Sequence, residues 1–200
     1  NKARFKTIYR NGLSNRYGRR MQAISGLHFN YSLAEDIWDN NFLSDDSEKI
    51  SNEKSLVYFG GIRNLKRMNW LILYLFGASP IVPKSLISND YDGLESLDSN
   101  YYYLPYSTSL RMSDIGYQTN YQNDLQISPN SLDEYLSDLL SATNKESSVF
   151  RKIPLKNNNE YSQLNANILQ IEDEYYSSSR PKSTSLENKR MLLKLKTGGV

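Results

Sequence analysis

Apolar and polar side chains alternate along residues 21–31, and this period of two predicts a strand with one face on a core. The predicted core face carries Met21, Ala23, Leu27, Phe29 and Tyr31. The opposite face carries Gln22, Asn30 and His28, which is the only histidine of the chain. Gly26, in the middle of the run, would let a ligand or another backbone approach closely. We therefore interpret residues 21–31 as a binding strand.

Helical spacing predicts the elements on both sides of this strand. Residues 2–17 predict an amphipathic helix, whose apolar face holds Phe5, Ile8, Tyr9 and Leu13. Ser32 to Glu35 form a capping box, in which a serine is followed three residues later by a glutamate. This signal predicts that the strand ends there and that a short helix runs to about Phe42.

Two further helices are predicted downstream. Ser51 is the expected cap of a long helix that ends at Phe76, with Gly77 as the residue that stops it. The second half of this helix, residues 68–76, is apolar nearly all round, so we expect it to be buried. A second capping box at Ser131 predicts a helix with apolar positions at Leu132, Tyr135, Leu136, Leu139 and Leu140.

The last third of the chain predicts a turn at residues 157–159 and a second long strand at residues 163–176, in the same sheet as residues 21–31. The pattern as a whole has strands separated by long helical insertions and lacks regular βαβ units. It predicts an α+β fold in which helices lie on one side of an antiparallel sheet.

Composition narrows the class of protein. The 200 residues suffice for one sizeable domain, and a net charge of +2 is too small to indicate a polyanionic partner for the whole chain. The absence of cysteine excludes disulfides and thiolate metal sites and fits a reducing cytosol. The longest apolar run, residues 70–76, is far shorter than the roughly 20 residues that a membrane span needs. We expect a cytoplasmic protein without a membrane partner.

One segment departs from this nearly neutral balance. The first twenty residues hold seven lysines or arginines and no acidic residue. Such a cluster suits a nucleic-acid interface, although a charge run of this kind is more often the solvated face of a helix. The sequence leaves both interpretations open.

Four motifs, in order along the chain, resemble one family. They are YRNGLSNRYGRRMQAISGLHFNYSL at residues 9–33, YLFGASP at 74–80, YYLPYSTSLRMSDIGY at 102–117 and NILQIEDEYYSSSRPK at 167–182. Together they resemble glutamate–cysteine ligase of the gamma-proteobacterial type. Because the blocks are spread over most of the chain in the same order, chance similarity is a poor explanation for them.

The resemblance implies a fold and an activity. The implied fold is that of the glutamine synthetase-like superfamily, in which a curved antiparallel sheet forms a funnel for the substrates. The implied reaction is ATP-dependent ligation of the glutamate γ-carboxylate to the cysteine amine through a γ-glutamyl phosphate, the first step of glutathione biosynthesis. The implied cofactors are ATP and Mg²⁺ or Mn²⁺, with L-glutamate and L-cysteine as substrates and no nucleic acid as a partner.

Family members are longer at both ends, so the resemblance also implies that residues 1–200 are an internal piece. We expect them to be the central part of a single catalytic domain, inactive alone, in an enzyme that is a monomer when full length.

The resemblance assigns residues to the amino-acid substrates. It gives Arg111 to glutamate as a catalytic residue, since a planar guanidinium suits a bidentate grip on an α-carboxylate. Gln22 matches a position that contacts the amino-acid substrates, and the cysteine pocket is assigned to Tyr9, Leu13, Tyr117 and Tyr176. From spacing alone, Tyr9 and Leu13 are equally well explained as core residues, and an arginine such as Arg111 is often held by a nearby acid such as Asp114.

Metal and phosphate roles are assigned in the same way. His28 matches a metal ligand, and the family's metal-binding carboxylates are expected mostly outside these residues; the alternative is a structural histidine. Arg180, as a second catalytic residue, and Lys182 match the binding site of the transferred phosphate, and a solvated turn is the alternative. Asp173 stands where the family has an asparagine, so its role is open.

Two other functions are also consistent with the sequence. One is a related carboxylate–amine ligase with another amine acceptor, which the residues of the cysteine pocket would distinguish. The other is a nucleic-acid-binding module that uses the basic segment Lys2–Arg20 and the many tyrosines. Salt-dependent binding to oligonucleotides would support the second rival.

Overall fold

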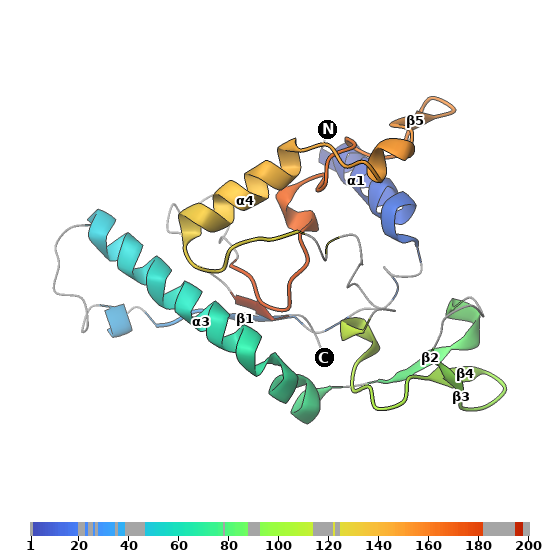
Figure 1. Cartoon of the computed structure of the whole chain (residues 1–200), viewed down its shortest axis with the longest axis horizontal. Helices are drawn as coiled ribbons and strands as arrows, with labels where there is room; N and C mark the ends of the chain where they lie inside the picture. The colour runs from blue at the N-terminus through green and yellow to red at the C-terminus, as the bar shows by residue number, and fades with distance from the viewer. Residues whose placement is uncertain are drawn as a thin grey trace.

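The computed structural model describes residues 2–19, 23, 26, 28–34, 36–38, 47–77, 79–87, 93–113, 122, 125–181 and 195–197. Its long helices are α1 (Lys2–Tyr17), α3 (Ser47–Phe76) and α4 (Leu132–Asn144), as Figure 1 shows. Short 3-10 helices are η2 (Lys84–Leu86), η3 (Leu110–Met112), η5 (Phe150–Lys152) and η6 (Glu172–Glu174). Together with small antiparallel sheets they form the α+β structure that the sequence predicted.

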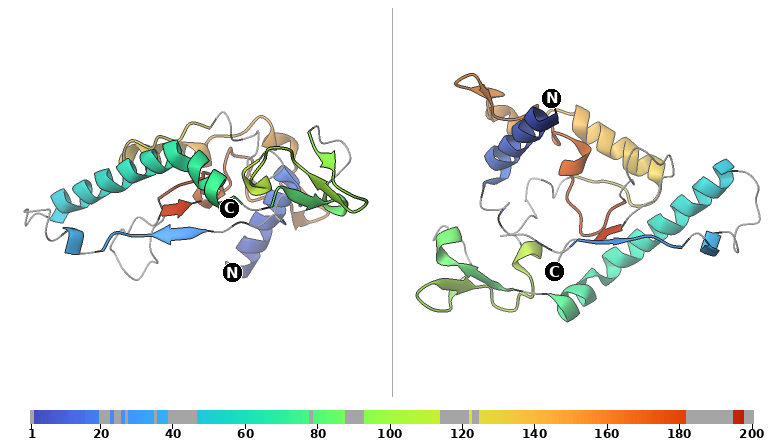
Figure 2. Two further views of the ribbon diagram at one scale, coloured as in Figure 1. Left: turned by 90° about the horizontal axis from the view of Figure 1, so that it is seen from below. Right: turned by 180° about the vertical axis from the view of Figure 1, so that it is seen from behind.

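The strands are short and form three separate sheets among the described residues. β1 (Phe29–Tyr31) pairs with β7 (Leu195–Thr197), and β5 (Lys156–Asn157) pairs with β6 (Glu160–Tyr161). In the third sheet, β4 (Tyr101–Tyr103) lies between β2 (Ile81–Pro83) and β3 (Glu95–Ser96). Every pairing is antiparallel. Figure 1 and Figure 2 show the three-stranded sheet beyond the C-terminal end of α3, away from α4.

Local sequence signals agree with several of the observed boundaries. The Ser131 hydroxyl accepts a hydrogen bond from the Glu134 amide at 3.2 Å, so the predicted capping box begins α4. α1 ends at Gly18, whose φ of +87° suits glycine and whose amide donates to the Ser14 carbonyl at 2.9 Å. The predicted turn between β5 and β6 holds two asparagines with positive φ, a conformation that asparagine tolerates.

The core lies where α3 and α4 face residues 168–175, as Figure 1 shows. Phe59 and Leu169 are fully buried there, and the Phe59 ring meets the Tyr135 ring edge-on, with 5.8 Å between centroids. The other buried members are Trp38, Tyr58, Ile62, Ile127, Leu139, Ala142 and Tyr175. Arg63 adds a polar link, because it donates to the carbonyls of Pro129 and Asn130 just before α4.

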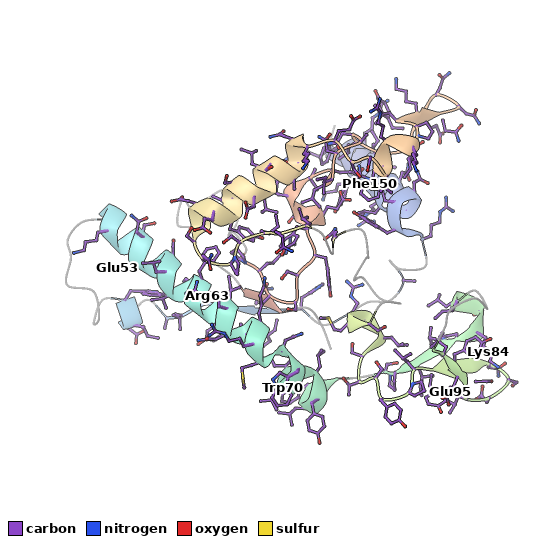
Figure 3. The ribbon with its side chains drawn as sticks, viewed as in Figure 1. Glu53, Arg63, Trp70, Lys84, Glu95 and Phe150 are labelled. Atoms are coloured by element: carbon purple, nitrogen blue, oxygen red, sulfur yellow. The ribbon has the colours of Figure 1, made fainter. Side chains whose placement is uncertain are left out.

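The second half of α3 is exposed, so the prediction that it is buried was wrong. The exposed side chains there include Met68, Trp70, Tyr74, Leu75 and Phe76, and Figure 3 shows Trp70 on the side of the helix away from α4. A helix that is apolar all round needs neighbours on every side, and the described residues supply them on one side only. None of the helices in the described part of the chain is long and apolar enough to cross a membrane.

The ends of α3 also differ from the prediction. The helix begins at Ser47, four residues before the expected cap, and runs unbroken through Gly60 and Gly61. It does end at Phe76, and the Gly77 amide donates to the Leu73 carbonyl at 2.8 Å. A Cβ at Gly77 would overlap that carbonyl and the Thr108 side chain, so glycine is needed here for a close approach of the chain.

The predicted binding strand is shorter than expected. Of residues 21–31, the strand in the described residues covers only Phe29–Tyr31, and Ala23 lies in a turn. The predicted core face is wrong at Phe29 and Tyr31, which are 66% and 49% exposed. β1 has β7 as its neighbour, and these two aromatic rings lie outside the buried core of the described residues.

Residues 163–176 do not form the predicted second strand. Apart from η6 and one isolated bridge between Asn167 and Glu146, this segment has no regular structure. Its backbone groups are satisfied by side chains, for example the Asn165 carbonyl by Arg16 and the Leu164 amide by Gln170. Local side-chain hydrogen bonds of this kind compete with a strand ladder.

Replacing Phe59 by alanine should lower the free energy of unfolding by about 3–5 kcal/mol, because the ring is fully buried in the core. Phe76→Ala is the matched control on the same helix: its ring is 65% exposed, so the expected loss is below about 1 kcal/mol. Urea unfolding of the two variants measures both values. Equal losses would contradict the core described here.

The chain should lose stability above about pH 10, because burial raises the pKa values of Tyr135 and Tyr175 from 10.0. The folded state then holds these protons more tightly than the unfolded state, so their contribution is complete below pH 10 and decreases as the pH rises further. Urea unfolding between about pH 8 and about pH 11 measures the slope. Replacing both Tyr135 and Tyr175 by phenylalanine should reduce the dependence of the free energy of unfolding on pH. Tyr106→Phe should not reduce it, because Tyr106 is fully exposed.

Candidate functional site

Arg111 and Tyr176 are far apart in sequence but lie together in the structure. Met112, the residue after Arg111, precedes Tyr176 by 64 positions and also contacts it. Arg111 belongs to η3, and its guanidinium carbon lies 5.7 Å from the centre of the Tyr176 ring. The Tyr176 hydroxyl donates to the Met112 sulfur at 3.2 Å. Two residues that the sequence assigned to amino-acid substrates are therefore neighbours in space.

The chemistry of this pair suits an anion. Burial raises the pKa of Tyr176, while the charge of Arg111 and a hydrogen bond from it act in the opposite direction. The phenol therefore stays protonated at neutral pH beside a fixed positive charge, and an anion that takes the place of the Met112 sulfur would accept its O–H. A carboxylate can accept hydrogen bonds from both groups.

Gln122 holds the backbone on both sides of the neighbouring Tyr175, directly before Tyr176. Its side-chain oxygen accepts a hydrogen bond from the Tyr176 amide at 3.0 Å, and its nitrogen donates to the Glu174 carbonyl at 3.1 Å. Sequence reasoning missed Gln122, because a glutamine in an irregular polar stretch gives no periodic or motif signal.

Arg180 is anchored by its own segment. Its guanidinium donates to the Tyr175 carbonyl at 3.2 Å and pairs with the Asp173 carboxylate at 3.4 Å. The Arg180 side chain is only 14% exposed, whereas that of Asp173 is 78% exposed, so the arginine is not a freely solvated turn residue. The structure thus gives Asp173 a partner that the sequence did not indicate.

α1 carries the two other described candidates for the cysteine pocket. Leu13 is buried and Tyr9 is half-buried, which fits a core residue and a pocket wall equally. Arg16, on the same helix, belongs to the basic cluster that suited a nucleic-acid interface or a solvated helix face. It is instead buried in an ion pair with Glu174, 3.1 Å from its carboxylate.

The described residues do not by themselves make a metal site. His28 is exposed just before β1, and this part of the chain holds no group of three or more histidine, aspartate or glutamate side chains that could hold a metal ion. Mg²⁺ prefers several oxygen ligands, so a lone imidazole does not fit it. Gln22, Tyr117 and Lys182 lie outside the described residues, as does Asp114.

Comparison with known proteins gives a consistent result over the whole length. The family model described as glutamate-cysteine ligase matches residues 1–200. A glutamate–cysteine ligase of Alcanivorax borkumensis is 46% identical over 100% of this chain, and one of Vibrio vulnificus is also 46% identical over 100% of it.

A solved structure agrees with these relatives. The crystal structure of a glutamate–cysteine ligase from Francisella tularensis, in complex with AMP, superimposes with a TM-score of 0.84 and 39% identity over 98% of this chain. The chain spans about 39% of the length of the Alcanivorax relative and 40% of the Francisella protein. With a family model matched from the first residue to the last, the chain belongs to the glutamate–cysteine ligase family.

Proposed function

We propose that this chain is part of an enzyme that ligates the γ-carboxylate of L-glutamate to the amine of L-cysteine with ATP, the first step of glutathione biosynthesis. The observation that carries the proposal is the family match over residues 1–200. The AMP bound by the Francisella ligase supports the use of ATP here, since AMP has the same adenosine and α-phosphate.

The proposed reaction needs two steps because a carboxylate is a poor acylating agent. An oxygen of the glutamate γ-carboxylate attacks the γ-phosphorus of ATP, and ADP leaves. The cysteine nitrogen then attacks the acyl carbon of the γ-glutamyl phosphate, phosphate leaves with the electrons of its bond, and the new amide nitrogen loses a proton. The protein mostly positions these groups and neutralises their charge.

We assign Arg111 to the α-carboxylate of glutamate, and the cysteine pocket to Tyr9, Leu13, Tyr117 and Tyr176. The contact between Arg111 and Tyr176 supports this assignment. Reacting atoms must come within roughly 3–3.5 Å of each other, so residues that hold the two substrates have to be neighbours.

Arg180 and Lys182 are assigned to the transferred phosphate, and Gln22 to the amino-acid substrates. A guanidinium that Asp173 and the Tyr175 carbonyl already hold in place needs little reorganisation to meet a phosphate, which supports a catalytic role for Arg180. We propose His28 as one ligand of Mg²⁺ or Mn²⁺. Its partners would have to come from beyond the described residues, and the bound metal would supply positive charge to the phosphoryl groups.

The proposal extends to the whole protein. Residues 1–200 would form the central part of a single catalytic domain with the curved antiparallel sheet of the glutamine synthetase-like superfamily, in a cytoplasmic monomer. The nucleic-acid alternative is weaker, because Arg16 of the basic segment is buried against Glu174 and is not available to phosphates outside.

Arg111→Lys, in a ligase of full family length that contains this sequence, should raise the glutamate KM about ten- to hundredfold. An ammonium loses one of two parallel hydrogen bonds to the α-carboxylate, which is worth about 1.5–3 kcal/mol for a charged pair. The measurement is phosphate release that depends on ATP, glutamate and cysteine. Arg151→Lys is the control, since that side chain is 73% exposed, and an unchanged glutamate KM in Arg151→Lys and Arg111→Lys alike would refute the role of Arg111.

The 200-residue chain alone should form no γ-glutamylcysteine, because its described residues lack the carboxylates that a metal site needs. In the full-length ligase, His28→Ala should shift the Mg²⁺ dependence of turnover to higher concentrations. Phosphate release with Mg²⁺ titrated measures both effects. Robust activity of the isolated chain would count against the proposed division of the metal site.

A further inference from the structure

Arg16 and Glu174 form a buried ion pair that the proposed reaction does not use. Their side chains are both 0% exposed, and 3.1 Å separates Arg16 Nη1 from Glu174 Oε1. The two other ion pairs that the structure shows among the described residues have at least one well-exposed partner. Apolar residues of similar volume often stabilise a protein as much as a buried ion pair does, so stability alone is a weak reason for this pair.

The pair is the centre of a network in which Arg16 reaches four points of one segment. Besides Glu174, Arg16 donates to the Gln163 side chain at 3.0 Å, to the Asn165 carbonyl at 2.7 Å and to the Asn167 carbonyl at 3.1 Å. The planar guanidinium makes these bonds simultaneously, and a lysine ammonium could not. Arg16 therefore helps to fix the path of residues 163–174, together with backbone bonds from residues 166–169 to the end of α4 and the residues after it.

Glu174 is held equally firmly from other directions. One of its carboxylate oxygens also accepts a hydrogen bond from the Tyr17 hydroxyl at 2.7 Å. The other accepts one from the backbone amide of Gln170 at 2.6 Å. Gly12 lies against the Gln170 side chain, so closely that a Cβ would overlap it. α1 and residues 163–174 are thus fixed to each other by charge, hydrogen bonds and close packing.

These two elements carry the two described walls of the proposed cysteine pocket. Tyr9 and Leu13 belong to α1, and Tyr176 follows Glu174 by two residues. Gln122 donates a hydrogen bond to the Glu174 carbonyl and accepts one from the Tyr176 backbone amide. A shift of Glu174 would therefore also move Tyr176.

We propose that Arg16 and Glu174 are positioning residues that set the geometry of the cysteine pocket by fixing α1 relative to Tyr176. The inference rests on the proposed function. It assigns no contact with substrate to either residue: they act through the placement of Tyr9, Leu13 and Tyr176. Cysteine binding should therefore depend on the pair, and ATP and glutamate binding should depend on it far less.

The test uses a ligase of full family length that contains this sequence, with KM measured separately for cysteine, glutamate and ATP. Arg16→Lys and Glu174→Gln should each raise the cysteine KM about ten- to hundredfold, the size expected when a pocket group is displaced by about 1 Å. The KM values of glutamate and ATP should change less than about twofold, a selectivity that general loss of structure would not give.

Matched controls come from the exposed pair of the same charge types. Arg151→Lys and Glu146→Gln alter an ion pair whose side chains are 73% and 58% exposed, and they should leave all three KM values unchanged. Tyr17→Phe is the milder variant, in case the others fail to fold: it removes one hydrogen bond to Glu174 and keeps the ring that packs against Phe150. It should raise the cysteine KM about two- to fivefold, the size expected when the hydroxyl loses its bonds to Glu174 and Gln122.

A cysteine KM that is unchanged in Tyr17→Phe and in every folded variant of the pair would overturn the inference. So would a parallel rise of all three KM values, because it would indicate a purely structural role. The unsubstituted enzyme separates this failure from that of the proposed function. If it forms no γ-glutamylcysteine, the proposed function fails; if it is active while the variants bind cysteine normally, only the positioning role fails.

Discussion

The ion pair between Arg16 and Glu174 is the constraint on which the arrangement of the N- and C-terminal parts depends. Removing two charged side chains from water costs free energy unless each of their hydrogen-bond donors and acceptors finds a partner in the protein. The fold meets this condition with the amide and carbonyl groups of residues 163–170 and with the Tyr17 hydroxyl. The pair therefore satisfies the Asn165 and Asn167 carbonyls and the Gln170 backbone amide, in a segment without a strand ladder.

The same pair explains why some elements were predictable and others were not. α1 follows from helical spacing, α4 from a capping box and the β5–β6 turn from asparagines with positive φ, and each of these signals acts within a few residues. Residues 163–176 have an apolar pattern that resembles a strand, but their path is set by Arg16, about 150 residues earlier in the chain. A periodic pattern contains no information about such a distant partner.

The candidate site divides in a similar way. Arg111 and Tyr176 could be named from motifs, and their proximity fits that choice, yet only a structure reveals Gln122 between Glu174 and Tyr176. Asp173 was an unexplained departure from the family pattern, and its pairing with Arg180 depends on a turn that sequence periodicity does not describe. Gln122 lies outside the four motifs that resemble the family, so no motif draws attention to it.

The exposed second half of α3 has a consequence for how a longer chain would fold. During synthesis at about 5–20 residues per second, this helix would be complete well before the later part of a protein of the relatives' length. Until that part arrives, Trp70, Tyr74 and Phe76 would offer an apolar surface of the kind that chaperones bind and that promotes aggregation. The apolar side chains of this half-helix thus make it a site where a nascent chain would need protection.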